Sequence, residues 1–218
     1  MSPSLKKKFC QEQLRELFAA QGTKLAFQPH NFIYTPNHAA QSLYLLETGQ
    51  VSLQMLSTEG RILTLQMIEE QQIFGYMALT KSLNYDTFAE TTKVVSVLAL
   101  SHETILREIA TKPTLGLIFL EALAHYRLLV SRRLDEVAFK SVTARLASLF
   151  LDMAGASSEE QPFRLPPRTH QQLAEMINAY RETVTKVINQ FRAAKLLDID
   201  RSGITLLNLS RLRELAQN

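Results

Sequence analysis

The chemistry that this sequence offers most plainly lies between residues 181 and 186, in Arg181, Glu182, Thr185 and Lys186. If the segment is helical, these side chains lie away from its apolar positions and near the helix N-terminus. Arginine presents a planar fork of donors, glutamate only accepts hydrogen bonds, and lysine carries a mobile positive charge. No paired carboxylates, Ser/His/Asp set, metal-ligand spacing or glycine-rich phosphate loop stands out elsewhere. We therefore predict a binding surface and no enzyme.

Two apolar helical faces, separated by a short break, must position these side chains. The first face contains Leu173, Ala174 and Ile177, and the second contains Val184, Val187, Ile188 and Phe191. Asn178 lies between them and can adopt the left-handed conformation that a tight turn between helices requires. This pattern is typical of a helix-turn-helix, whose second helix presents base-reading residues near its N-terminal end.

The charge of this region also favours an anionic partner. Residues 164–195 contain six basic and two acidic residues, a local net charge of +4, whereas the whole chain carries +3. Contact with nucleic-acid phosphates requires such a local excess. Any one of these charges could equally belong to a solvated helix face. A hairpin signal follows at 197–207, and as a wing it would place Arg201 and Ser202 at its tip, near a phosphate.

The first half of the chain has a different periodicity. Between residues 25 and 100, short apolar strands alternate with polar residues and are separated by turns at Gly49 and Gly60. This spacing predicts an antiparallel sandwich or barrel. Before it, residues 11–20 carry apolar side chains at helical spacing.

From Pro113 a heptad seam begins. Its members are Leu120, Leu123, Arg127, Val130, Leu134 and Val137. Such a seam is buried against another helix, and the sequence contains no second long heptad helix. We predict a homodimer, with packing onto the chain's own β domain as the alternative.

Composition excludes several classes of protein. Of the 218 residues, 46% are hydrophobic and 21% are charged, as in an ordinary globular protein. We expect no apolar run near the roughly 18 residues of a membrane span, no secretory signal, and a cytoplasmic protein with no membrane partner. The single cysteine, Cys10, excludes an internal disulfide and a cysteine-rich zinc or iron–sulfur site supplied by one chain.

Taken together, these segments resemble the CRP/FNR family of bacterial transcription regulators along essentially the whole chain. The resemblance rests on residues 43–51, 58–61, 74–75, 142–147 and above all 181–186. It implies an α+β fold: an N-terminal antiparallel β-roll of the cyclic-nucleotide-binding type (a double-stranded β-helix), a long dimerisation helix and a C-terminal winged helix-turn-helix. The corresponding domains would be a sensor at 1–112, the dimerisation helix at 113–140 and the DNA-binding domain at 141–218.

The resemblance also implies that the partner is double-stranded DNA. The positions implied to contact it are Thr169, His170, Gln171, Arg181, Glu182, Thr183, Thr185, Lys186, Arg201 and Ser202. Arginine can pair with guanine O6 and N7, and glutamate can accept from cytosine N4. Lys186 departs from the more familiar arginine, so we expect a palindrome with half-sites related to TGTGA and looser discrimination opposite Lys186. RNA polymerase is an implied partner through the exposed loop 155–168.

The sensor pocket departs from the family pattern. Tyr76 follows Gly75 where cyclic-nucleotide-binding members have glutamate, and the segment 84–90 contains Asp86 but no arginine. An acidic side chain there would repel a phosphate, so the sequence argues against cyclic AMP or cyclic GMP bound in the usual way. The residues expected to bound an effector pocket are Phe74, Gly75, Tyr76, Met77, Tyr85, Tyr126 and Arg127.

The effector itself stays open. A 2-oxoglutarate-like acid could be held by Arg127 or Tyr126, because the family's 2-oxoglutarate sensors use a long-helix arginine. That arginine aligns with Tyr126, one residue away. Haem is a second possibility, with candidate ligands His30, His38, His102 and His125. A third is no ligand at all. The competing class of function is a ligand-binding or protein-interaction module whose winged helix does not read DNA specifically.

Overall fold

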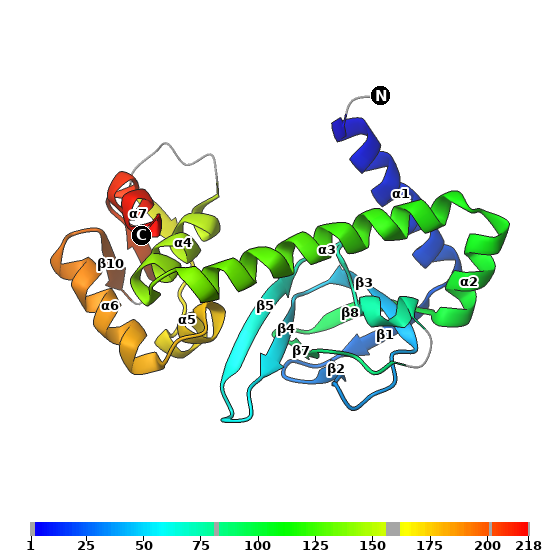
Figure 1. Cartoon of the computed structure of the whole chain (residues 1–218), viewed down its shortest axis with the longest axis horizontal. Helices are drawn as coiled ribbons and strands as arrows, with labels where there is room; N and C mark the ends of the chain where they lie inside the picture. The colour runs from blue at the N-terminus through cyan, green and yellow to red at the C-terminus, as the bar shows by residue number, and fades with distance from the viewer. Residues whose placement is uncertain (1–2, 81–82, 156–161, 201, 218) are drawn as a thin grey trace. The chain divides into compact units, whose positions relative to one another are not determined.

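The computed structural model describes residues 3–80, 83–155, 162–200 and 202–217 (Figure 1). The chain divides into two compact units, residues 1–55 with 65–129 and residues 56–64 with 130–218, so the division falls within the long helix. The predicted α+β class and the order of β-roll, long helix and winged helix-turn-helix are confirmed.

Two four-stranded sheets form the first unit. Its strands are β1 (Thr23–Phe27), β2 (Phe32–Tyr34), β3 (Ser42–Thr48), β4 (Val51–Leu56), β5 (Ile62–Ile68), β6 (Ile73–Phe74), β7 (Phe88–Thr91) and β8 (Val95–Ser101). The sheet orders are β1-β8-β3-β6 and β2-β7-β4-β5, and the registered pairs are antiparallel. Val51 and Leu53 face the core as their alternation predicts, whereas Met55 is exposed. The predicted antiparallel sandwich is confirmed.

Helices cover this β-roll. They are α1 (Pro3–Gln21), the short 3-10 helix η1 (Tyr76–Leu79), α2 (His102–Thr111) and the long α3 (Thr114–Phe139). Leu14, Leu17 and Phe18 of α1 are buried in one cluster with residues of β3, β8 and the start of α3, which confirms the apolar spacing at 11–20.

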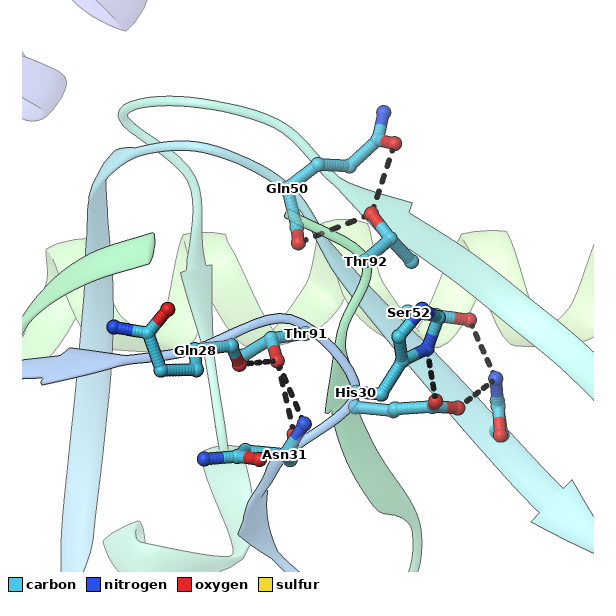
Figure 2. Close-up of polar contacts among 9 residues, drawn as sticks. Gln28, His30, Asn31, Gln50, Ser52, Thr91 and Thr92 are labelled. Atoms are coloured by element: carbon cyan, nitrogen blue, oxygen red, sulfur yellow. Dashed lines mark hydrogen bonds and ion pairs between the residues drawn. The ribbon is translucent and has the colours of Figure 1, made fainter. Parts of the chain in front are cut away.

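A polar network ties the turn between β1 and β2 to the end of β7 (Figure 2). The buried hydroxyl of Thr91 donates to the carbonyl of Gln28 at 2.6 Å and lies 3.1 Å from that of Asn31. The same oxygen accepts the N–H of Asn31 at 3.0 Å. Beside it, the Thr92 hydroxyl lies 3.3 Å from the carbonyl of Gln50. These hydrogen bonds give partners to backbone groups of the turn that do not pair with a neighbouring strand, and so they hold the turn in place.

Helix α3 leaves most of the predicted seam uncovered. Leu120, Leu123, Arg127 and Leu134 are exposed, and Val130 and Val137 are half-buried. The β-roll instead packs on another face of α3, formed by Leu115, Ile118 and Phe119. Three large apolar side chains outside the predicted seam are also exposed: Leu117, Leu128 and Phe139. The open apolar surface is therefore wider than the heptad pattern alone indicates.

The same helix corrects the expectation about apolar runs. An 18-residue window of α3 has a mean hydropathy of 1.3 and at most two charged residues, so by length and composition it could cross a membrane. Isolated charges interrupt the helix without lowering this average enough, which is why no such run was expected. An apolar helix face that a protein partner covers can have the same length and hydropathy as a membrane span, because each of them removes apolar surface from water.

In its described residues, the second unit contains the end of α3, four further helices and a small sheet. Its helices are α4 (Val142–Ala154), α5 (His170–Ile177), α6 (Arg181–Ala193) and α7 (Leu209–Ala216). The predicted hairpin is β10 (Leu197–Asp200) and β11 (Gly203–Leu206). A strand that the sequence did not predict, β9 (Phe163–Leu165), pairs with β11 to give the order β10-β11-β9. Three residues followed by two prolines are too few to show an alternation.

The break between α5 and α6 has the predicted geometry. Asn178 adopts the left-handed conformation, with φ 52° and ψ 57°. Thr169 caps the start of α5 in a capping box, in which its hydroxyl accepts from Gln172 N at 3.1 Å and Gln172 Oε1 accepts from Thr169 N at 2.9 Å. The apolar faces of both helices are buried in one core cluster, so the helix-turn-helix is confirmed.

Candidate nucleic-acid interface

The first two turns of α6 present polar side chains to solvent. Val184, Val187 and Ile188 anchor the helix in the core, while Arg181, the first residue of the helix, and Lys186 are exposed. Glu182 is exposed as well, whereas Thr183 and Thr185 are half-buried. No side chain caps the N-terminus of α6 at Tyr180, so its first backbone N–H groups can donate to an anion. The arrangement combines fixed donors and acceptors with a favourable helix dipole.

A hydrogen bond joins the starts of α5 and α6. The Thr185 hydroxyl donates its one proton to the carbonyl of Arg181 at 2.9 Å, so its oxygen accepts from His170 Nδ1 at 2.8 Å. This assigns the proton of a neutral His170 ring to Nδ1 and places the ring beside the first turn of α6. Both residues were expected to contact DNA, but their bond to each other was not predicted.

Arg145 of α4 holds the turn between the two helices. Its Nη1 donates to the carbonyl of Ile177 at 2.6 Å and to that of Asn178 at 3.3 Å. Burial lowers the pKa of this guanidinium, and its buried Nε has no hydrogen-bond partner within the part of the chain that the structure describes. These carbonyls end α5 and would otherwise lack donor partners. From the sequence, Arg145 stood out only as part of the 142–147 motif, and its role was missed.

The wing is held together by Asp200. Both of its carboxylate oxygens accept from Arg164 Nη2 at 2.9 Å, and Oδ1 also accepts from the Ser202 hydroxyl, from Ser202 N at 2.7 Å and from Gly203 N at 3.1 Å. The hydrogen bonds from Ser202, its hydroxyl above all, and then the Arg164 guanidinium lower the pKa of Asp200 to about 2. Ser202 is exposed at the tip, but its N–H and hydroxyl donate to Asp200.

These pairs reduce the local charge excess that the sequence suggests. Of the six basic residues counted between 164 and 195, Arg164 pairs with Asp200 and Arg192 pairs with Asp198 at 3.4 Å. Both aspartates lie just outside the counted window, which is why the excess was overestimated. Arg201, predicted at the wing tip, lies outside the described residues.

The Asp200 network predicts a specific pH dependence for the stability of this unit. The folded pKa of about 2 is below the unfolded value of roughly 3.9, so the contribution is complete above pH 4 and is lost as pH falls through about 2. We expect Asp200→Asn to lower the melting temperature at pH 7 and the difference from wild type to shrink steadily as pH falls from 4 to 2. Thermal unfolding at pH 7, 4, 3 and 2 measures this, with Asp198→Asn as control. Parallel wild-type and Asp200→Asn curves would contradict it.

A cavity of about 180 Å³ lies in the first unit at the predicted sensor position. It is lined by Tyr34, Leu53, Gly75, Tyr76, Met77, Leu79, Thr80, Asp86, Thr87, Leu123 and Tyr126. Four of the predicted lining residues are therefore present: Gly75, Tyr76, Met77 and Tyr126. Burial raises the pKa of Tyr76 and of Tyr126 to about 12, so both phenols stay neutral.

The other three predicted residues do not line this cavity. Phe74 is fully buried in the core beside Tyr44, with ring centroids 5.3 Å apart. Tyr85 stacks on Tyr34, and its hydroxyl donates to the carbonyl of Ser42 at 2.7 Å. Arg127 is exposed on α3. Between β6 and η1, Gly75 adopts the left-handed conformation with φ 85°.

The cavity does not fit the acid or haem alternatives. Among its described lining residues Asp86 is charged and none is arginine, lysine or histidine, so no group there pairs with a carboxylate or a phosphate. None of the candidate haem ligands His30, His38, His102 and His125 lines it either. In the described ranges, no cluster of three or more histidine, cysteine, aspartate or glutamate side chains could hold a metal ion.

Comparison with known proteins agrees with this geometry. Residues 24–112 match the cyclic nucleotide-binding domain, and residues 144–215 match the Crp-like helix-turn-helix domain. The global nitrogen regulator of Synechococcus elongatus is 26% identical over 187 residues, covering 84% of each protein. A CRP/FNR-family regulator of Thermus thermophilus matches with a TM-score of 0.72 at 26% identity, over 90% of this chain and 99% of that one. The c-di-GMP responsive regulator CLP of Xanthomonas campestris matches with a TM-score of 0.78 at 22% identity, over 88% and 97%.

With both domains matched in this order, the chain belongs to the CRP/FNR family of DNA-binding transcription regulators.

Proposed function

We propose that the protein is a homodimeric, sequence-specific transcription regulator that reads a palindromic DNA site with α6. The observation that carries this proposal is the exposed set of Arg181, Glu182 and Lys186 on a helix whose preceding turn is held by Asn178 and Arg145. A rigid turn of this kind is what direct readout requires, because base contacts depend on sub-ångström placement. The protein would act in the cytoplasm, with RNA polymerase as a further partner.

The polar side chains divide into readers and anchors. Arg181 would pair with guanine O6 and N7, and Glu182 would accept from cytosine N4, which gives a half-site related to TGTGA. Lys186 would donate to a base as a point charge and so discriminate less. Thr183 and Thr185 complete this helix face. Phosphate contacts would come from Thr169, Gln171 and Arg201, and these fix register without reading sequence. His170 and Ser202 would join them by exchanging their bonds to Thr185 and Asp200 for bonds to a phosphate.

Dimerisation would use the open apolar face of α3. We expect the double variant Leu120→Lys/Leu134→Lys to be monomeric at micromolar concentration, because these leucines are 61% and 67% exposed in the single chain and two charges per helix would oppose burial. The symmetric DNA site should then be bound far more weakly, since each protomer reads one half-site. Sedimentation velocity measures the mass. Leu106→Lys, on the 52% exposed Leu106 of α2, is the control that should stay dimeric. An unchanged dimer in the double variant would overturn this use of α3.

The sensor would respond to an effector other than a cyclic nucleotide, or to none. Asp86 in the cavity and the absence of a described cation among its lining residues support this. The relative from Xanthomonas campestris is c-di-GMP responsive, but two phosphates would meet the same acidic side chain here. We expect isothermal titration with cyclic AMP, cyclic GMP or c-di-GMP to give no heat of binding at tens of micromolar. Stoichiometric binding of any of them would refute this part of the proposal.

The salt dependence of DNA affinity separates the regulator from a protein-interaction module. We expect a duplex with two inverted TGTGA half-sites to be bound at least about 1,000-fold more tightly than a scrambled duplex, with affinity falling steeply as salt rises. Fluorescence anisotropy at several salt concentrations measures both quantities. Equal, weak affinity for the two duplexes would favour a winged helix that does not read DNA.

A further inference from the structure

A second, larger cavity of about 260 Å³ lies in the first unit, between α1, the β5–β6 segment and α3. It is lined by Leu14, Arg15, Leu45, Gln66, Gln71, Gln72, Ile73, Tyr76, Ile118, Glu121, Ala122, His125, Tyr126 and Leu129. Tyr76 and Tyr126 line both cavities, and their rings stack with centroids 5.1 Å apart. The two stacked rings therefore form a wall that the two cavities share. The sequence did not predict this second cavity, because its residues come from segments more than a hundred positions apart.

The cavity has an apolar floor and a polar rim. Leu14, Leu45 and Ile118 on the floor are buried. The rim contains Arg15 and Glu121, both exposed, together with the side-chain amides of Gln66, Gln71 and Gln72. Such a pattern suits a small amphipathic molecule whose apolar body enters the cavity while its head stays at the rim.

Hydrogen bonds within the rim define what it can offer. His125 Nδ1 lies 2.8 Å from the carbonyl of Glu121, which can only accept, so Nδ1 carries a proton and Nε2 of the neutral ring is an acceptor. Gln72 Oε1 accepts from Glu69 N at 3.1 Å and lies 3.4 Å from Gln66 Nε2, so the amide nitrogen of Gln72 can donate outward. Among the side chains that the structure describes, the rim thus supplies one guanidinium, one carboxylate and neutral donors and acceptors.

We propose that this cavity binds a hydrophobic α-amino acid of about the size of leucine or phenylalanine. Its carboxylate would pair with Arg15, its ammonium with Glu121 and the neutral acceptors, and its side chain would pack on Leu14, Leu45 and Ile118. The described rim carries one cationic and one anionic side chain, Arg15 and Glu121, and a zwitterion matches both, whereas a fatty acid offers no ammonium to Glu121 and an apolar amine offers no carboxylate to Arg15. A carboxylate accepts several hydrogen bonds, so Glu121 can receive the ammonium in addition to its contacts within the chain.

Titration calorimetry of the full-length protein with defined probes tests this site. L-Leucine and L-phenylalanine are the expected ligands, and 4-methylpentanoate and 3-methylbutylamine are the leucine analogues that lack the ammonium and the carboxylate. We expect one amino acid per protomer and at least about tenfold weaker binding of both analogues, because each lacks one charge-assisted hydrogen bond. No heat with either amino acid, or equal affinity for the analogues, would overturn the proposal.

Three variants locate the bound molecule. Ala122→Leu fills the cavity and should abolish binding, and Arg15→Gln should weaken it at least about tenfold. Arg107→Gln removes the same charge from the exposed face of α2 and should bind like wild type. Circular dichroism checks that each variant is folded. If Ala122→Leu misfolds, the amino-acid affinity of Arg15→Gln is compared with that of Arg107→Gln, and weaker binding in Arg15→Gln alone supports the site. Binding that survives in folded Ala122→Leu, or that falls equally in both arginine variants, would place the ligand elsewhere.

Discussion

Replacing Arg181 by alanine is expected to remove most of the preference for the symmetric site while leaving weak, non-specific DNA binding nearly intact. The side chain is exposed on the first turn of α6 and offers a planar fork of donors. A bidentate contact with guanine contributes about 1–3 kcal/mol of discrimination, and a dimer makes it twice, so the loss should be roughly 30-fold or more. Anisotropy with the specific and scrambled duplexes measures the ratio.

Two companion variants make this result interpretable. Gln190→Ala on the same helix, outside the predicted reading set, should keep the full preference for the symmetric site. Glu182→Ala should relax selectivity at one base pair of each half-site, by about 1–3 kcal/mol, and leave the other positions unchanged. If Arg181→Ala kept the wild-type ratio, or if Glu182→Ala kept the full sequence preference, α6 would not be the reading element assigned here.

Replacing Arg145 by methionine is expected to destabilise the winged-helix unit by about 2–4 kcal/mol. Methionine keeps much of the apolar stem but donates no hydrogen bond, so the carbonyls of Ile177 and Asn178 lose their partner in a half-buried position. An unsatisfied buried carbonyl costs about 1–3 kcal/mol, and two are affected. Hydrogen exchange of the α5 and α6 amides should accelerate by the factor that corresponds to this loss of unfolding free energy.

The matched control is Arg213→Met, an exposed arginine of α7 in the same unit. It should change neither the exchange of these amides nor the unfolding free energy by more than a few tenths of a kcal/mol. Equal effects of the two substitutions would mean that Arg145 does not hold the turn. DNA affinity should fall in Arg145→Met, because a loosened turn no longer presents Arg181 and Glu182 in one orientation.

The helix-turn-helix could be predicted from the sequence because its information is local. The apolar spacing of α5 and α6 and the left-handed Asn178 follow from the 3.6-residue period and turn chemistry. The bracing by Arg145 could not be predicted, because its partners are backbone carbonyls 32 and 33 positions away. The pairing of Arg164 with Asp200 was hidden for the same reason, since it depends on the three-residue strand β9.

The sequence indicates where the sensor cavity lies, but not which residues line it. Gly75, Tyr76, Met77 and Tyr126 line the cavity, whereas Phe74 and Tyr85 belong to the aromatic core and Arg127 is exposed. Which side chains face the cavity depends on contacts between segments far apart in the sequence, such as the bond from the Tyr85 hydroxyl to the Ser42 carbonyl, and hydrophobic periodicity does not show such contacts. The apolar seam of α3 was recognised from its heptads, whereas Leu117 and Leu128 lie outside that register.

Selection from a randomised duplex pool tests whether α6 reads a specific DNA sequence. Purified full-length protein is used alone and, in parallel, with a small-molecule extract of the expressing cells. We expect enrichment of a two-fold symmetric site whose half-sites are related to TGTGA and lie about one helical turn apart, with one base pair per half-site relaxed in Glu182→Ala. No symmetric enrichment under either condition, or an enriched site that Arg181→Ala and Glu182→Ala leave unchanged, would contradict it.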